Sequence, residues 1–397
     1  MTARLVATAG PLNGRVVPFT EHEVFLLERS KTLNPQIRDK ERFVSRIQFL
    51  LEVNPPRARL VDMGNPSGTF VNGKRVNAVE LAHFDEIKAG YAHFRMELPG
   101  AGTSGEQRAE ASSSKKLPPP IPRIPEYRIE RELGRGPFGA VYEAVREEDN
   151  ASVAIKTIVP AAAADSEQVD KFLKDVAQLW KMKTHPHIVP YSQVGEEDGI
   201  LWFAMERIVG TDLGSLLKES GKRDEKTAVR LTMQILSALE HAHSCGLGHG
   251  NLKTSNVFIE EQPDKKRTIR VADFGVARAY AMLPMSGLSF TDCVNQSVDC
   301  LAPEQIANFR SLTASADQFS AAVTMYRLLT DQSPYNVSPT FHLLGQIVNG
   351  SIISLGQRRR DLSPKLVEAV ERALAHDPAD RFPDIRSFAE ALFPFAT

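Results

Sequence analysis

The stretch His249-Gly250-Asn251-Leu252-Lys253-Thr254-Ser255-Asn256, written HGNLKTSN, decides how the rest of the chain is interpreted. At its centre Asn251 carries a neutral amide, which offers a carbonyl acceptor and two N–H donors, where a carboxylate would offer acceptors only. An amide nitrogen does not take up a proton at neutral pH. The stretch therefore lacks a proton acceptor at residue 251, whatever site it belongs to.

Four further motifs flank this stretch. Upstream lie the glycine-rich run LGRGPFGAVY at 133–142 and VAIK at 153–156, and downstream lie DFG at 273–275 and APE at 302–304. A lone G-x-G-x-x-G run is weak evidence, because such loops serve several nucleotide-binding folds. The complete set, however, resembles the motif order of the protein kinase family, in which the catalytic loop reads H-R-D-L-x-x-x-N. The resemblance covers residues 126–397 and implies an α+β bilobal protein kinase fold.

The resemblance also implies an ATP site in this domain. In the family the glycine-rich loop closes over the phosphates, the VAIK lysine meets the α- and β-phosphates, and a hinge backbone bonds the adenine edge. The residues expected at the nucleotide are Gly134, Gly136, Gly139, Val141, Ala154, Lys156, Asp175, Met205, Glu206 and Ile208. Asp175 stands where a glutamate usually pairs with the lysine. Because aspartate is one methylene shorter, an ion pair with Lys156 and a merely exposed side chain both stay open.

The same resemblance implies a magnesium site beside a catalytic loop that has lost its base. Asn256 and Asp273 match the family's metal ligands, and one amide with one carboxylate and substrate phosphates suits Mg²⁺. Asn251 stands where an aspartate accepts the proton of the substrate hydroxyl, and Gly250 stands where an arginine is usual. The catalytic candidates are therefore Asn251, at the degenerate base position, and Lys253 of the same loop.

The first hundred residues show a different pattern. Short apolar runs such as VFLL at 24–27, FLL at 49–51 and TFV at 69–71 are separated by Gly, Pro and Asn turns. Asn72-Gly73 is a two-residue hairpin signal that requires positive φ at both positions. Residues 1–98 are therefore predicted to form an all-β sandwich.

Several of these runs resemble a forkhead-associated (FHA) domain, a family that reads phosphothreonine peptides. Arg29, the Ser45-Arg46 pair and the stretch DMGNPSGTFVNG at 62–73, which contains Ser67, stand at the family's motif positions. The resemblance implies that Arg29, Ser45, Arg46 and Ser67 bind the phosphopeptide, since guanidinium and hydroxyl donors suit a phosphate. The sequence departs from the pattern at Glu28, Gln48 and Pro66. The alternative is that Arg29 and Arg46 are ordinary surface cations on a sandwich used for protein contact.

Residues 99–125 are predicted to be a linker. GAGTSG at 100–105 and SSS at 112–114 are flexible in composition, and PPPIP at 118–122 favours extended polyproline. A plain spacer and a proline-rich docking segment are both compatible with this composition. Thr103 and Ser112–Ser114 are candidate phosphosites, so the peptide read by the first domain could come from this linker or from another protein.

Composition narrows the possible partners. A net charge of −1 gives no general field for nucleic acid or for an acidic membrane. Three cysteines are too few and too scattered for a disulfide framework or a zinc site, which favours a reducing compartment. No run of about 18 apolar residues occurs, as a membrane span would require. We therefore expect a cytoplasmic protein with no nucleic-acid or membrane partner. The Arg358-Arg359-Arg360 run is expected to form a solvated turn.

Three functions remain open from sequence. The first is a pseudokinase, which binds Mg-ATP and signals by conformation while its FHA-like domain reads a phosphorylated partner. The second is an active but slow Ser/Thr protein kinase, because positioning and charge neutralisation supply much of the catalysis of phosphoryl transfer. The third is a scaffold that binds no nucleotide. The intact glycine-rich loop, Lys156, Asn256 and Asp273 favour the first over the third.

Overall fold

The computed structural model describes the chain apart from residues 1, 21, 29–46, 65–66, 100–121, 137–138, 159–168, 171, 175–184, 262–266, 278–297, 308–311, 337–339 and 397. The chain forms two compact units. The first comprises Met1–Ile121, Ser289–Thr291 and Ser338–Asn349, and the second comprises Pro122–Leu288, Asp292–Val337 and Gly350–Thr397.

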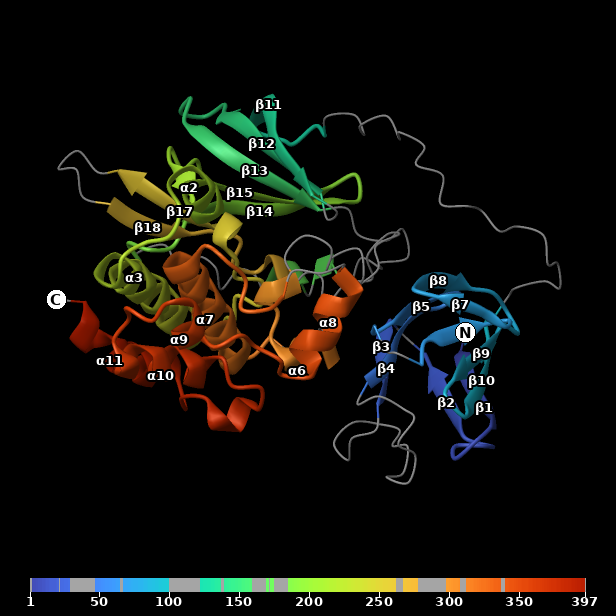
Figure 1. Ribbon diagram of the computed structural model, residues 1–397. Coiled ribbons are helices and arrows are strands. Elements are labelled where there is room, and N and C mark those ends of the chain that lie inside the picture. Colours follow the sequence, from blue (N-terminus) through green and yellow to red (C-terminus); the bar gives the residue numbers. More distant parts are fainter. Residues whose placement is uncertain are drawn as a thin grey trace. The chain divides into compact units, whose positions relative to one another are not determined.

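The first unit is built from two antiparallel sheets (Figure 1). One has the strand order β2-β1-β10-β9-β6-β7 and the other the order β3-β4-β5-β8. The strands are β1 (Ala3–Ala9), β2 (Val16–Phe19), β3 (Glu23–Glu28), β4 (Ile47–Asn54), β5 (Arg57–Asp62), β6 (Thr69–Val71), β7 (Lys74–Val76), β8 (Ala78–Leu81), β9 (Glu86–Ala89) and β10 (Ala92–Glu97).

The core of this unit lies between the two sheets. Phe49 of β4 packs edge-on against Phe94 of β10, with ring centroids 5.9 Å apart. Alternate residues of β10 are buried, as expected for a strand with one face on a core. Asn72 and Gly73 have φ of 49° and 78°, so the predicted hairpin turn between β6 and β7 is confirmed. The predicted β-sandwich is confirmed.

The second unit begins with an antiparallel sheet of strand order β11-β12-β13-β15-β14 (Figure 1). Its strands are β11 (Tyr127–Gly136), β12 (Gly139–Arg146), β13 (Ser152–Ile158), β14 (Tyr191–Glu197) and β15 (Ile200–Glu206). A smaller sheet of β16 (Thr211–Asp212), β17 (Val257–Glu261) and β18 (Arg267–Val271) follows. The β17–β18 hairpin leads directly to the DFG sequence at 273–275.

The rest of this unit is largely helical. Its named α-helices after β15 are α2 (Leu213–Ser220), α3 (Glu225–Ser244), α6 (Pro303–Ala307), α7 (Ala314–Thr330), α9 (Leu355–Arg358), α10 (Pro364–Ala373) and α11 (Ile385–Leu392). Helix α8 (Thr340–Val348) belongs to the first unit. One face of α3 carries a buried stripe of apolar residues: Ala228, Leu231, Ile235, Leu239 and Ala242. The side chains of α7 are buried nearly all round, because α3, α10 and α11 pack against it. A strand-rich lobe followed by a helical lobe is the predicted kinase fold, which is confirmed.

The prediction for the arginine run 358–360 is wrong in part. Arg359 is 8% exposed, and its guanidinium donates to the carbonyl oxygen of Leu329 at 2.5 Å. Arg358 lies over the ring of Tyr326, with 5.6 Å between Cζ and the ring centroid. Arginine can bury its stem while its planar head satisfies carbonyl oxygens, so a charged run need not be a solvated turn.

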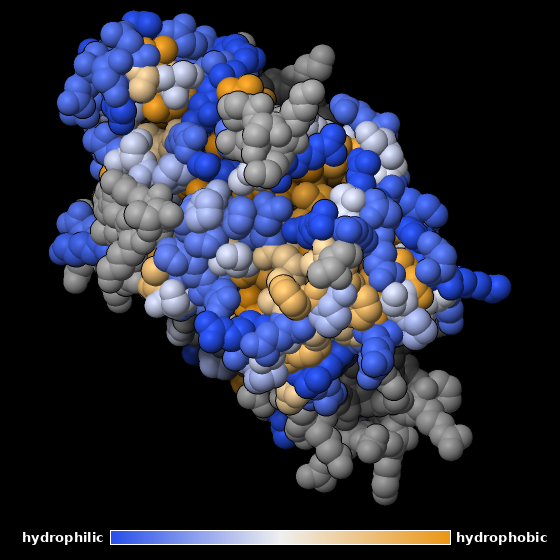
Figure 2. Space-filling model, turned by 90° about the vertical axis from the view of Figure 1, so that its left-hand side faces the viewer, coloured by the Kyte–Doolittle hydropathy of each residue, from blue (hydrophilic) through white to orange (hydrophobic). Residues whose placement is uncertain are grey.

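The surface seen in Figure 2 is mostly hydrophilic, with hydrophobic residues gathered in separate patches. Among the described large apolar side chains, Val209 and Phe393 are the most exposed, at 72% and 63%. They come from different segments, and single exposed apolar side chains are ordinary on protein surfaces. Among the described residues, no helix is both long and apolar enough to span a membrane.

Candidate functional site

The centre of the candidate site is an ion pair between two predicted residues. Lys156 lies in the middle of β13, between β12 and β15, and its Nζ is 2.5 Å from Oδ2 of Asp273. Burial by itself would raise the pKa of Asp273, but the charge and hydrogen bond of Lys156 oppose this, and the net effect lowers it. Asp273 therefore carries its negative charge at neutral pH.

The backbone around Asp273 is fixed by its neighbours. Asp273 has φ of 67°, a left-handed conformation that is uncommon outside glycine. The next residue, Phe274, is fully buried, with its ring centroid 4.7 Å from that of His249. The hydroxyl of Tyr191 donates to the carbonyl oxygen of Phe274 at 2.8 Å. These contacts aim the carboxylate of Asp273 toward Lys156.

The loop that carries Asn251 is held by a buried carboxylate on α7. Asp317 accepts the backbone N–H of His249 through Oδ2 and that of Gly250 through Oδ1, both at 2.7 Å. His243 of α3 lies 2.8 Å from Oδ2 of the same carboxylate through its Nε2. Asp317 is fully buried, and a buried carboxylate is stable only when its oxygens are satisfied in this way. It fixes the start of the catalytic loop.

Gln305 holds the same loop from the other side. Its side-chain Nε2 donates to the carbonyl oxygen of Gly250 at 2.9 Å, and its Oε1 accepts from the N–H of Ala302 at 3.1 Å. Gly250 has φ of 70°, and a Cβ there would lie 2.3 Å from Cδ2 of Leu312. The position where the family has an arginine is thus shaped here for a residue without a side chain.

Asn256 and Asp273 present oxygen atoms suited to Mg²⁺. The amide Nδ2 of Asn256 donates to the backbone carbonyl of Asn251 at 3.1 Å, which leaves its oxygen as the atom for a metal ion. Asp273 uses Oδ2 for Lys156 and retains Oδ1. One carboxylate and one amide oxygen, completed by phosphate oxygens and water, fit the coordination that Mg²⁺ prefers.

Lys253 belongs to the same electrostatic group. Burial lowers the pKa of Lys253, the carboxylate of Asp273 acts in the opposite direction, and Lys156 lowers it further. The structure thus brings Lys156, Lys253 and Asp273 close enough for their charges to interact. Two cations beside one carboxylate form a site suited to phosphate groups.

The other predicted nucleotide residues lie on the strands around Lys156. Gly134 and Gly136 are at the end of β11, and Val141 pairs with Lys156 across β12 and β13. At Gly139 a Cβ would lie 1.7 Å from the carbonyl oxygen of Thr157, so only glycine fits this close approach of two backbones. The remaining predicted contacts form the floor and hinge side: Ala154, which pairs with buried Met205, then Glu206 at the end of β15, and Ile208 after it.

Some predicted residues lie outside the described part of the chain. These are Asp175 of the nucleotide site, and Arg29, Ser45 and Arg46 of the phosphopeptide site, with Pro66 beside it. Ser67 is described: the side chain of Gln48 donates to the carbonyl oxygen of Gly68 at 3.0 Å and to the Ser67 hydroxyl at 3.4 Å. Gln48, which replaces the family's histidine, is fully buried and holds this loop to β4.

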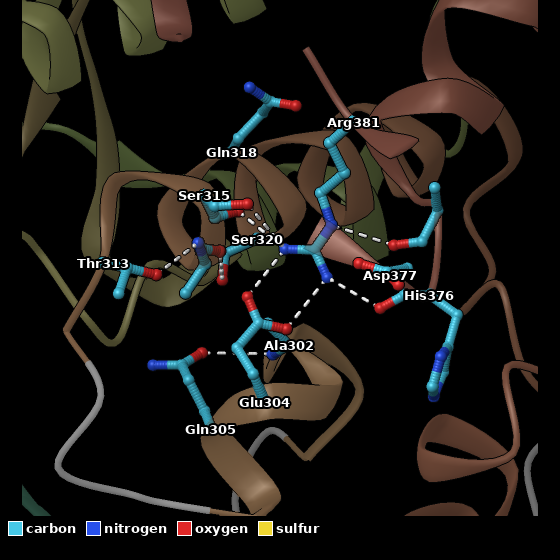
Figure 3. Close-up of polar contacts among 12 residues, drawn as sticks. Ala302, Glu304, Gln305, Thr313, Ser315, Gln318, Ser320, His376, Asp377 and Arg381 are labelled. Carbon is cyan, nitrogen blue, oxygen red and sulfur yellow. Dashed lines mark hydrogen bonds and ion pairs between the residues drawn. The ribbon is translucent and has the colours of Figure 1, made fainter. Parts of the chain in front are cut away.

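Sequence reasoning missed the residues that position the loop. Asp317 and Gln305 are identified only by their contacts, although a charged residue within the apolar run of α7 was a usable signal. Arg381 and Glu304, the last residue of the APE motif, form a two-fold contact of 2.7 and 2.9 Å (Figure 3). It joins the start of α6 to the segment before α11.

Comparison with protein families agrees with both units. The protein kinase domain model matches residues 127–392, and the FHA domain model matches residues 29–90. The serine/threonine-protein kinase PknF of Mycobacterium tuberculosis is 34% identical over 272 residues, which cover 67% of this chain and 55% of PknF. The serine/threonine-protein kinase pkn3 of Myxococcus xanthus is 28% identical over 270 residues, covering 67% of this chain and 49% of pkn3. The chain thus spans about half the length of the curated relatives it matches.

Solved structures show the same fold. The PknI kinase domain of Mycobacterium tuberculosis aligns with a TM-score of 0.53 and 27% identity over 69% of this chain and 97% of that chain. Rad53, solved with AMP-PNP, aligns with a TM-score of 0.55 and 21% identity over all of both chains. The motif order, the geometry around Lys156 and Asp273, and the family match agree: the chain belongs to the protein kinase family, with an FHA domain ahead of its kinase domain.

Proposed function

We propose that this protein is a pseudokinase: its kinase domain binds Mg-ATP but transfers phosphate weakly or not at all, and its FHA domain reads a phosphothreonine peptide. The observation that carries the proposal is the contrast within one loop. Asn256 and Asp273 offer oxygen ligands for Mg²⁺ beside Lys156 and Lys253, whereas Asn251 offers no proton acceptor. Asn256 and Asp273 would hold Mg²⁺, which would supply positive charge to neutralise the phosphates of the nucleotide.

Nucleotide binding requires a rearrangement of the Lys156–Asp273 pair. Both side chains are largely buried, at 16% and 15% exposed, and each neutralises the other. A phosphate group would take over Lys156, and the metal would take over the charge of Asp273. Each buried charge is thus neutralised by the other until the phosphate and the metal ion take the partners' places.

Mg-ATP is expected to raise the melting temperature of the protein by roughly 5–10 °C at a nucleotide concentration about 100 times Kd. The variant Asp273→Ala is expected to lose the Mg²⁺-dependent part of this shift, because it lacks the carboxylate ligand. The readout is the tryptophan fluorescence of thermal unfolding, since Trp180 and Trp202 both lie in the kinase domain. No shift in the natural protein would support the nucleotide-free scaffold instead.

An active but slow Ser/Thr kinase is the second candidate. Two features of the loop favour it. Lys253 is retained, and the buried side chains of Asp317 and Gln305 hold the loop in place although it lacks the base. The names of PknF and pkn3 identify these relatives as serine/threonine-protein kinases. Positioning and charge neutralisation alone support some phosphoryl transfer.

The FHA domain is proposed to bind phosphothreonine through Arg29, with Ser45, Arg46 and Ser67. Arg29→Ala is expected to weaken binding of a phosphothreonine peptide by about 10- to 100-fold, because hydrogen bonds to charged groups contribute about 1.5–3 kcal/mol. The measurement is fluorescence anisotropy with peptides copied from the linker around Thr103, and with a degenerate phosphothreonine library. Arg4→Ala, at an exposed position of β1, serves as the control and is expected to bind normally. Binding that is equal in both variants, or equal for unphosphorylated peptide, would favour surface cations without a ligand role.

A further inference from the structure

Three histidines that lie far apart in the sequence meet beside α3. His185 and His187 belong to the segment before β14, and His241 lies near the end of α3. The ring of His185 stacks on that of His241, with centroids 4.8 Å apart and an interplanar angle of 17°. It also meets the edge of the His187 ring, at a centroid distance of 5.6 Å. The nucleotide site described above uses none of these rings.

The hydrogen bonds of His185 determine which ring nitrogen can accept a further proton. The backbone N–H of His187 donates to Nδ1 of His185 at 3.3 Å, so Nδ1 acts as an acceptor and carries no hydrogen. The hydrogen of the neutral ring is then on Nε2, which lies 3.2 Å from the hydroxyl oxygen of Ser237 on α3. A second proton can enter only at Nδ1. There it would face the N–H of His187 and replace a hydrogen bond with a repulsive contact.

The surroundings of the cluster disfavour positive charge. Nε2 of His241 is buried and has no hydrogen-bond partner within the described ranges. Burial lowers the pKa of His185 to about 4, and the neighbouring His241 and His187 act in the same direction. Burial also lowers the pKa of His187, and the positive charge of Arg270 lowers it further. The hydrogen bond between Nδ1 of His187 and the carbonyl of Ile269 acts in the opposite direction.

The groups that face the cluster come from two elements besides its own segment. From α3 come the hydroxyl of Ser237 and the ring of His241, and from β18 come the carbonyl of Ile269 and the guanidinium of Arg270. The carboxylates near Arg270 are those of Glu206 and Glu260, and both pair with Arg270 itself. Within the described part of the chain, every group that shifts the pKa of His185 disfavours its charged form.

The segment that carries His185 and His187 is hydrogen-bonded to the strand that leads to Asp273. The N–H of Val189 donates to the carbonyl of Val271, and the N–H of Val271 donates to the carbonyl of His187, both at 2.9 Å. Val271 ends β18 and is two residues before Asp273. A displacement of residues 185–189 from α3 would therefore reach the strand end that positions the DFG aspartate.

We propose that His185, His187 and His241 form a proton-sensitive latch, which holds residues 185–189 against α3 and releases them when Nδ1 of His185 is protonated. The direction of the effect follows from linkage. The pKa of His185 in the folded protein, about 4, is below the ordinary value of 6.5, so the unfolded chain binds more protons. The stabilising contribution is complete above the unfolded value and is lost as the pH falls from about 6.5 toward 4.

The test compares the natural protein with His185→Asn between pH 7 and pH 5. The asparagine side chain retains an oxygen that can accept from the N–H of His187 but does not titrate. The melting temperature of the natural protein, followed by tryptophan fluorescence, is expected to fall by roughly 3 °C more than that of the variant. Protection of the Val189 and Val271 amides from hydrogen exchange, corrected for the intrinsic pH dependence, is expected to fall only in the natural protein. His376→Asn, at an exposed histidine, should follow the natural protein.

A second variant tests the cluster if His185→Asn does not fold. His241→Phe keeps a stacking ring but removes the imidazole that disfavours charge on His185, so the pKa of His185 in the folded protein should rise toward 6.5. The loss of melting temperature between pH 7 and pH 5 should therefore be smaller than in the natural protein. An unchanged pH profile in His241→Phe would overturn the latch. So would equal losses of melting temperature in the natural protein and His185→Asn, or unaltered protection at Val189 and Val271.

Discussion

Asn251→Asp is expected to raise the rate of phosphate transfer from Mg-ATP by about 10²- to 10⁴-fold, the usual contribution of a positioned general base. The supports of the loop do not depend on the side chain of residue 251. Asp317 and Gln305 bind the backbone of His249 and Gly250, and Asn256 binds the backbone carbonyl of Asn251. A carboxylate at residue 251 would therefore enter a loop that is already positioned. The measurement is transfer of labelled phosphate to a generic basic substrate and to the protein itself.

Two controls separate the base from other effects of the substitution. Asn251→Gln keeps an amide and is expected to show no rise in rate. Asn251→Asp combined with Asp273→Ala lacks a metal ligand and is expected to lose the gained activity. Gly250 is left unsubstituted in all of these variants, because its φ of 70° and the nearby Leu312 side chain disfavour a larger residue. Equal rates in the natural protein and Asn251→Asp would identify an enzyme that works without the usual base.

Arg381→Ala is expected to cost about 3–5 kcal/mol of unfolding free energy, as when one partner of a buried ion pair is removed. Arg381 is 2% exposed and makes a two-fold contact with Glu304 (Figure 3). Its guanidinium also donates to the carbonyl oxygens of Ser315, Ala375 and His376. The substitution would leave a carboxylate and several carbonyl groups without their donor. Urea unfolding followed by tryptophan fluorescence reports on the kinase domain, which holds both tryptophans.

Arg386→Ala is the matched control for that experiment. Arg386 pairs with Glu240 at 2.8 Å, but the two side chains are 72% and 41% exposed. An exposed ion pair of this kind contributes little to stability because water screens its charges, so the control should unfold nearly as the natural protein does. If both arginine variants lost the same small amount, the Arg381 network would not hold the helices together as the contacts indicate.

The sequence predicted those features that depend on residue type in a fixed local order. Asn72-Gly73 gave the hairpin because few other residues adopt two successive positive φ angles. The fold followed from the order of HGNLKTSN and the motifs that flank it.

Features that depend on long-range contact could not be predicted in the same way. Asp317 meets His249 and Gly250 across 67 or more positions of sequence, so its role exists only once α7 is packed. The sequence predicts a solvated Arg359 because the residue is charged. Its partner, the carbonyl of Leu329, is brought beside it only by the folded structure. The stacking of His241 on His185 is a further contact of this kind, because it forms only when α3 and the distant segment before β14 are packed together.

The most direct test of the proposed pseudokinase is to measure binding and transfer on one preparation of the natural protein. Calorimetry gives the Kd for Mg-ATP, and single-turnover transfer of labelled phosphate gives the rate beside that of Asn251→Asp. The expected result is saturable, Mg²⁺-dependent binding of ATP, with a transfer rate at least about 10²-fold below that of Asn251→Asp. Absence of binding, or a rate in the natural protein equal to that of Asn251→Asp, would contradict the proposed function.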